Sequence, residues 1–318
     1  MSENKWLILK RGVLFLFLLG FFLWPSQSDY LTIRARFLPA QARLLPLALP
    51  AAPYPTNFTG KPVPWFSAHS VLVVDPDSAV ILYAKNEQAP LLPASTVKMM
   101  TALVVLEHYR LDDYLTVNGM DDFGQDIGLV TGERLSVANL LYGLLVASAN
   151  DAAQVLAQHY PGGQLAFVAR MNQKAQELNL KNTVFANPTG LDVDEQEHPL
   201  AEVSYSTGLD LSRLARIAWR EATFRQLVAT PQITITDASG MIKHPLTNIN
   251  TLLGRLAGVQ GIKTGWTERA GECLVSLVER EGHHLLVVVL GSQNRFDETA
   301  RLVEWAFANY RWQDVQAS

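Results

Sequence analysis

The sequence predicts an α+β fold in which one sheet is built from segments that lie far apart in the chain. Residues 70–84 and 272–290 each have the pattern of two strands joined by a turn, one pair near the start of the globular part and the other near its end. The chain between these pairs is mostly helical in pattern. Of the 318 residues, 48% are apolar and 18% are charged, which supplies a full core and excludes disorder over most of the chain.

The first elements are a hairpin and a series of helices. Residues 70–75 (SVLVVD) and 80–84 (VILYA) are rich in β-branched residues and are separated by a turn, so they are expected to pair. Apolar residues at helical spacing predict a helix over residues 94–109, directly after a proline. Three further segments follow the same helical spacing, at 136–158 (as one or two helices), 165–178 and 211–219.

The last third of the chain supplies the remaining strands and a closing helix. Residues 232–236 (QITIT) alternate like a half-exposed strand. Residues 272–278 and 284–290 (HLLVVVL) are expected to pair through a short turn. Apolar residues on one stripe predict a helix over 298–310.

Composition excludes several classes of function. Lys and Arg number 26 and Asp and Glu number 30, so the net charge of −4 does not fit a polybasic protein, and no nucleic-acid partner is expected. The single cysteine, Cys273, excludes an intramolecular disulfide, a cysteine-rich zinc site and an iron–sulfur cluster, and it is expected to be a small buried residue. The seven histidines form no His-x-x-x-His pair on a helical pattern, which disfavours a zinc peptidase. We expect no metal and no organic cofactor.

The N-terminus has the pattern of an export signal. Lys5, Lys10 and Arg11 precede an apolar run over residues 13–24, which is shorter than the roughly 20 residues that span a bilayer. Residues 1–28 are therefore expected to be a cleaved signal peptide or, counted from Trp6, an uncleaved tilted membrane anchor. Either interpretation places the rest of the chain in the periplasm or on the outer face of the cytoplasmic membrane.

A proline-rich stretch separates this signal from the globular part. Residues 29–64 contain seven prolines among many Ala and Leu residues, which prevents a continuous helix and favours an extended, semi-rigid linker. Because the stretch is also apolar, an alternative is that part of it packs on the domain. One domain is expected over residues 65–313, with no C-terminal β-rich domain after it.

Ser95 and Lys98 form the first chemical motif. At i and i+3 on a helix their side chains share a face, with Cβ atoms roughly 5–6 Å apart. A serine hydroxyl becomes a nucleophile when a base lies within hydrogen-bond range, and a lysine serves as that base when burial lowers its pKa. The alternative interpretation is an ordinary helix cap beside a solvated lysine.

Two later tripeptides could complete a site around this pair. Ser148 and Asn150 lie in a small-residue turn between two apolar helical runs, where they could relay a proton and hold a lysine or a carbonyl, although a capping turn has the same composition. The run Lys263–Trp266 (KTGW) could bind a carboxylate on a strand edge and donate a backbone N–H to an oxyanion, although a surface turn is the alternative.

The order Ser-x-x-Lys, Ser-x-Asn, Lys-Thr-Gly matches the motif set of penicillin-binding proteins and class A β-lactamases. From about residue 70 to 307 the chain resembles the serine D-alanyl-D-alanine carboxypeptidases, the low-molecular-weight penicillin-binding proteins of peptidase S11 type, notably in LLPASTVKMMTALVVLE and GIKTGWTERAGECLVSLV. The resemblance implies a β-lactamase/transpeptidase-like fold, in which an antiparallel sheet is flanked by helices and carries a mostly helical insertion.

The resemblance also implies a role for each motif residue. Ser95 is the expected acyl-enzyme nucleophile, Lys98 its general base and Ser148 the proton relay. Arg295 and Trp305 keep the spacing of a family arginine that binds the substrate's terminal carboxylate, although a surface residue at a helix start is the alternative. The substrate-binding set implied is Asn150, Lys263, Thr264, Gly265, Trp266 and Arg295.

The function implied is removal of the terminal D-alanine from peptidoglycan stem pentapeptides, with β-lactams as covalent inhibitors. D,D-endopeptidase activity on crosslinked stems uses the same chemistry and stays open, as does a non-catalytic wall-binding protein. A class A β-lactamase is disfavoured, because Ala175 stands where the glutamate of its Glu-x-x-Leu-Asn loop should be.

Overall fold

The computed structural model describes residues 53–119, 124–192 and 203–314. The predicted export signal and most of the predicted linker lie outside these residues. Among the described helices, none combines the length and the apolar composition that crossing a bilayer needs.

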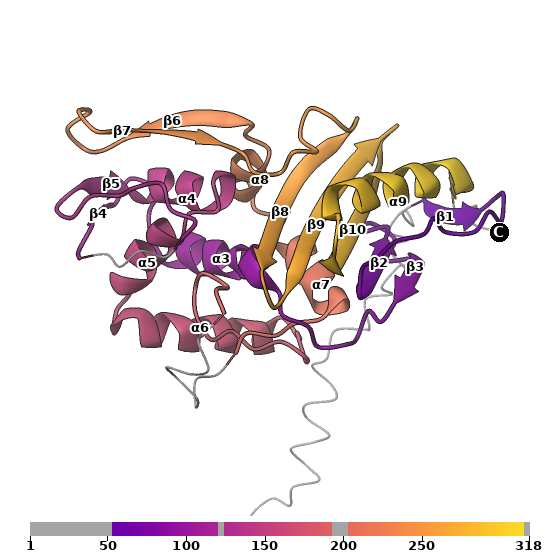
Figure 1. Ribbon diagram of the computed structural model, residues 1–318, viewed down its shortest axis with the longest axis horizontal. Helices are drawn as coiled ribbons and strands as arrows, with labels where there is room; N and C mark the ends of the chain where they lie inside the picture. The colour runs from indigo at the N-terminus through magenta and orange to yellow at the C-terminus, as the bar shows by residue number, and fades with distance from the viewer. Residues whose placement is uncertain (1–52, 120–123, 193–202, 315–318) are drawn as a thin grey trace, which may run out of the picture. The chain divides into compact units, whose positions relative to one another are not determined.

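A five-stranded antiparallel sheet is the centre of the fold, with strand order β3-β2-β10-β9-β8 (Figure 1). Both predicted hairpins are confirmed, and β2 pairs with β10, so the two ends of the domain meet in one sheet. The strand β8 lies at the edge beside β9. The five strands are β2 (Ser70–Val74), β3 (Ile81–Lys85), β8 (Val259–Thr267), β9 (Gly271–Arg280) and β10 (His283–Ser292).

Helices cover both faces of this sheet. Val71 and Val73 pack with Leu302 and Val303 of the closing helix α9, whereas Leu72 faces the opposite way into the larger helical core, as the alternation of a strand requires. Figure 1 shows α9 across one face and the other helices together on the opposite side. The helices are α3 (Lys98–His108), α4 (Val137–Val146), α5 (Asn150–Gln158), α6 (Gly163–Glu177), α7 (Gly208–Ala218), α8 (Ala222–Val228) and α9 (Arg295–Asn309).

Three two-stranded sheets complete the described chain. The first joins β1 (Tyr54–Asn57) to β11 (Tyr310–Gln313), so the end of the proline-rich stretch packs on the domain, as the alternative interpretation has it. The other two are β4–β5 and β6–β7, and the β6–β7 hairpin runs over α4 (Figure 1). Their strands are β4 (Tyr114–Thr116), β5 (Arg134–Ser136), β6 (Gln232–Thr236) and β7 (Lys243–Thr247).

The predicted helix over 94–109 differs from the structure at its start. Its first four residues, Ala94–Val97, form a 3₁₀ turn and only then does α3 begin. Ala94 has a φ of +47°, a left-handed conformation that an ordinary helix does not contain. This turn sets the position of Ser95, which lies inside it.

Candidate active site

Ser95 is presented by the 3₁₀ turn at the mouth of a cleft. The hydroxyl of Thr96 donates to the carbonyl of Pro93 at 2.7 Å and fastens the turn. Ser95 itself is half-buried and caps neither helix. Its side chain is therefore accessible, as a nucleophile must be, and the helix-cap interpretation is wrong.

Lys98 lies one turn further on and is fully buried. Its Nζ is 3.0 Å from Ser95 Oγ, 2.6 Å from Asn150 Oδ1 and 2.7 Å from the carbonyl oxygen of Thr189. The amide and carbonyl oxygens have only lone pairs, so a neutral amine spends its two N–H bonds on them. The lone pair of that amine is then left for the hydroxyl proton of Ser95.

Burial makes the neutral amine available at ordinary pH. Loss of hydration lowers the pKa of Lys98 from 10.5 to about 7, and the negative charges of Asp126 and Asp151 act in the opposite direction. The interpretation of Lys98 as a solvated surface charge is therefore wrong. Its surroundings are those that a lysine general base needs.

Ser148 and Lys263 form a second hydroxyl–amine pair in the same site. Ser148 lies in the turn between α4 and α5 with a φ of +62°, and its Oγ accepts a hydrogen bond from Lys263 Nζ at 2.7 Å. Lys263 is buried in β8, and burial, followed by the positive charges of Lys98 and Arg295, holds its pKa well below the ordinary value. The site thus contains two buried amines, each beside a serine hydroxyl.

The edge strand β8 runs directly beside Ser95. A Cβ atom on Gly265 would lie 2.8 Å from the backbone nitrogen of Ser95, so only glycine lets the two backbones approach this closely. Trp266 follows at the rim of the cleft with 61% of its surface exposed. An edge strand leaves backbone groups free to pair with an extended peptide.

Polar atoms next to Gly265 are arranged for an anion. Thr264 Oγ1 and Arg295 Nε are buried and have no hydrogen-bond partner within the described part of the chain. The Nη1 of Arg295 donates to the carbonyl of Gly265 at 3.0 Å, which directs the guanidinium to the strand. A carboxylate placed here would satisfy donors that are otherwise unpaired.

One cleft of about 640 Å³ brings the predicted residues together. The amines of Lys98 and Lys263 reach serines that line it. The structure therefore gathers every residue of the predicted site around one cavity. Its lining comprises Ser95, Gly124, Gln125, Ser148, Asn150, Leu191, Ile249, Thr264, Gly265, Trp266, Glu272 and Arg295.

The sequence analysis missed a loop whose backbone contacts Lys98 and α3. The carbonyl of Thr189 accepts from Lys98, and Thr101 Oγ1 donates to the carbonyl of Pro188 at 2.7 Å. Gly190 has a φ of +81°, and a Cβ there would lie 2.1 Å from the carbonyl oxygen of Ala94. A Pro-x-Gly turn after a helix was the available signal, but nothing in it indicates which lysine its carbonyl meets.

Glu272 was missed as well. This β9 residue lines the cleft, and its Oε2 accepts a hydrogen bond from the backbone N–H of Arg295 at 2.7 Å. It therefore positions the start of α9, and with it the guanidinium of Arg295.

Two residues to which the sequence analysis gave no catalytic role are buried in the structure. Ala175 is packed within α6, so no carboxylate stands at that position. Cys273 is fully buried, and burial raises the pKa of its thiol to about 11, as fits a small core residue. Within the described ranges, no group of three or more His, Cys, Asp or Glu side chains is placed to hold a metal ion.

The sequence profile of the D-alanyl-D-alanine carboxypeptidase family, Peptidase S11, matches residues 57–294. The chain is 31% identical to D-alanyl-D-alanine carboxypeptidase DacF of Bacillus subtilis over 76% of its own length and 63% of that protein's. It is 33% identical to a D-alanyl-D-alanine endopeptidase of Pseudomonas aeruginosa, over 74% of this chain and 76% of the relative.

Solved structures with the same fold carry related names. A penicillin-binding protein homologue of Mycobacterium tuberculosis superposes with a TM-score of 0.74 at 30% identity, covering 83% of this chain and 100% of that one. The DD-transpeptidase of Streptomyces K15 superposes with a TM-score of 0.71 at 29% identity, covering 78% and 100%. The expected transpeptidase-like α+β fold is therefore confirmed.

Proposed function

The chain belongs to the D-alanyl-D-alanine carboxypeptidase family, Peptidase S11, and from this premise we propose that it removes the terminal D-alanine from peptidoglycan stem pentapeptides through an ester on Ser95. The observation that carries the proposal is the 3.0 Å contact between Lys98 Nζ and Ser95 Oγ, made by an amine whose other two partners only accept hydrogen bonds.

Acylation follows from this arrangement. Neutral Lys98 takes the hydroxyl proton of Ser95 as Oγ attacks the carbonyl carbon between the two D-alanines. The backbone N–H groups of Ser95 and Trp266 are the proposed donors to the oxyanion that forms. The proton taken by Lys98 is relayed through Ser148 to the departing nitrogen, so the C–N bond breaks, D-alanine leaves and Lys98 is neutral again.

Deacylation uses the same groups in reverse. A water molecule loses a proton to Lys98, attacks the ester carbon and displaces Ser95 Oγ, which regains its proton. Thr264 and Arg295 are proposed to bind the substrate's terminal carboxylate, since Thr264 Oγ1 and Arg295 Nε are buried and have no hydrogen-bond partner among the described residues. A β-lactam would acylate Ser95 by the same first step.

A second substrate is supported by the comparisons. D-alanyl-D-alanine endopeptidases of Pseudomonas aeruginosa and Escherichia coli match this chain at 33% and 32% identity, levels equal to those of the carboxypeptidases. Hydrolysis of crosslinked stems differs only in the size of the leaving group. Both substrates lie in the cell wall, so we propose an extracytoplasmic protein that is secreted or held by its N-terminus.

The test offers both substrates to the purified protein. Stem pentapeptide and crosslinked dimer stems are incubated separately, and free D-alanine and monomer stems are quantified. We expect D-alanine release that is lost in Ser95→Ala, and the ratio of the two rates decides between carboxypeptidase and endopeptidase. Failure of a fluorescent penicillin to label the intact protein would instead favour a non-catalytic wall-binding protein.

A further inference from the structure

One wall of the cleft is a loop formed by residues 124–130, called the cleft loop below. Gly124 and Gln125 line the cavity. The carbonyl of Gln125 accepts a hydrogen bond from the backbone N–H of Asn150 at 2.8 Å, so the loop is fastened to the residue whose side chain holds Lys98. The carboxylate of Asp151 accepts from the backbone N–H groups of Ile127 and Leu129, both at 3.1 Å.

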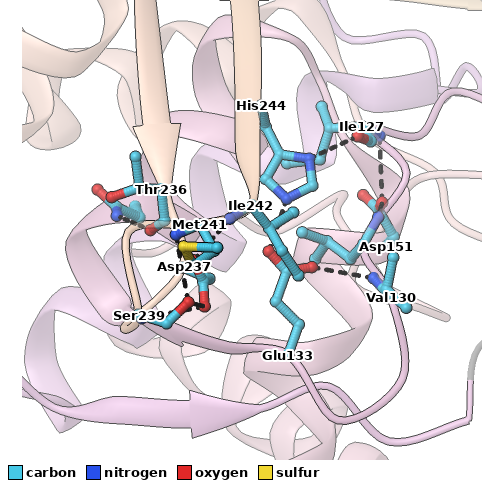
Figure 2. Close-up of polar contacts among 12 residues, drawn as sticks. Ile127, Val130, Glu133, Asp151, Thr236, Asp237, Ser239, Met241, Ile242 and His244 are labelled. Atoms are coloured by element: carbon cyan, nitrogen blue, oxygen red, sulfur yellow. Dashed lines mark hydrogen bonds and ion pairs between the residues drawn. The ribbon is translucent and has the colours of Figure 1, made fainter.

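A buried histidine from a distant part of the chain forms a hydrogen bond with the same loop (Figure 2). His244 lies on β7 and is 5% exposed. Its Nδ1 is 3.0 Å from the carbonyl oxygen of Ile127, and its Nε2 is 2.6 Å from Oε1 of the buried Glu133. The other carboxylate oxygen of Glu133 accepts from the backbone N–H of Val130 at 3.0 Å.

The protons in this cluster follow from its acceptors. The carbonyl of Ile127 has only lone pairs, so Nδ1 of His244 must carry a hydrogen. The short contact between Nε2 and Glu133 needs one more proton between the two atoms. With one proton on that contact the pair has no net charge, which lowers the free-energy cost of burying it.

The cluster is separate from the bonds that hold the hairpin elsewhere. Asn139 Nδ2 donates to the carbonyl of Thr236 at 2.7 Å, and the backbone N–H of Ala238 donates to the carbonyl of Arg134 at 2.7 Å. Both bonds fasten the hairpin to α4 and β5, and neither contacts the cleft loop. The hairpin therefore has attachments that do not depend on His244.

We propose that His244 and Glu133 are positioning residues for the reaction: they clamp the cleft loop against α5 and thereby fix Asn150, Asp126 and Asp151 around Lys98. This inference rests on the proposed function, because it takes Lys98 as the base. Neither residue contacts the reacting atoms; each acts through the loop.

Loss of the hydrogen bonds between His244, Glu133 and the cleft loop would change the charges around Lys98 and therefore its pKa. Asp126 belongs to the cleft loop, and its Oδ1 accepts from the backbone N–H of Asp151 at 3.1 Å. Asp126 and Asp151 raise the pKa of Lys98, in opposition to burial, which lowers it. If the loop withdraws, Asp126 withdraws with it and the pKa of Lys98 falls.

Two variants separate the clamp from ordinary packing. In His244→Gln the side-chain amide can donate to Glu133 but leaves the carbonyl of Ile127 without its donor. In Glu133→Gln the amide N–H can donate to Nε2 of a neutral His244 while its carbonyl accepts from Val130, so the clamp stays closed. His284→Ala is the matched control, since His284 pairs with Asp77 at 2.7 Å at the start of β10 and neither residue lines the cleft.

The experiment measures acylation by a fluorescent penicillin from pH 5.5 to 9, with urea unfolding of each full-length variant as the folding check. We expect His244→Gln to lower the maximal acylation rate at least about tenfold and to move its acid midpoint down by about half a pH unit. Glu133→Gln and His284→Ala should keep the wild-type rate and midpoint.

The outcomes are distinguishable. A folded His244→Gln protein with the wild-type rate and midpoint overturns the clamp while leaving the proposed function intact. Equal kinetic losses in both glutamine variants also overturn it, because Glu133→Gln keeps the hydrogen bonds. A wild-type protein that takes up no penicillin overturns the proposed function, and the inference with it.

Discussion

The rate at which Ser95 is acylated should depend on the protonation state of Lys98. The perturbation is pH itself, varied from 5 to 9 in the wild-type protein. Below its pKa Lys98 is an ammonium that has no lone pair for the hydroxyl proton, so the acylation rate should fall as the pH falls through about 7. The direction follows from the cause, because burial favours the uncharged amine and thereby lowers the pKa.

The magnitude follows from the size of that shift. With a pKa of about 7, roughly half of the amines are neutral at pH 7, about one tenth at pH 6 and about one hundredth at pH 5. At the ordinary value of 10.5, only about one lysine in 3,000 would be neutral at pH 7. Burial therefore raises the population of the active base by about a thousandfold.

The assay is the second-order rate of labelling by a fluorescent penicillin, with circular dichroism at each pH to confirm folding. Lys98→Arg is the matched variant, because arginine keeps the charge and cannot lose its proton. Above pH 7 it should be about 10²- to 10⁴-fold slower than the wild type, and the difference should narrow at lower pH as the wild-type rate falls. A wild-type rate that is constant from pH 5 to 9, or a Lys98→Arg protein with the wild-type profile, would refute the assignment of the base.

Three further outcomes are expected. Arg295→Ala should lower kcat/KM for a pentapeptide roughly 10- to 100-fold by removing a charged hydrogen-bond donor, and a C-terminally amidated peptide should lose much less; equal losses would exclude a carboxylate site. Gly190→Ala should lower the free energy of unfolding by at least about 2 kcal/mol in urea titrations, since its Cβ meets the carbonyl of Ala94 at 2.1 Å. Cys273 should resist iodoacetamide at pH 8 in the folded protein and react once it is unfolded, because burial holds the pKa of its thiol near 11; modification of the native protein would contradict its burial.

Helices and strands were predictable where the apolar residues recur at a regular spacing. This spacing is helical in α4, α5, α6 and α7 and alternating in the strands of the two hairpins, and it can be read from the sequence without knowledge of the fold. The three-residue strands β4 and β5 and the short helix α8 are too brief to show a period, and the sequence analysis did not predict them.

The 3₁₀ turn at Ser95 shows why the start of α3 was not predictable. Residues 94–97 have a helical composition, but their backbone lies so close to Gly190 and Gly265 that a Cβ atom on either glycine would clash with Ala94 or Ser95. Steric exclusion of this kind comes from segments distant in the chain. A local propensity scale contains no information about them.

By itself the sequence determined which groups could react: two serine hydroxyls, two lysine amines and an arginine, in a fixed order along the chain. Only the tertiary structure decided their chemical state. The pKa of Lys98 depends on the loss of hydration on burial and on the charges of Asp126 and Asp151. The hydrogen bond between His244 and Ile127 joins residues that are 117 positions apart in the chain. Desolvation and charge act through space, so they exist only once the chain has folded.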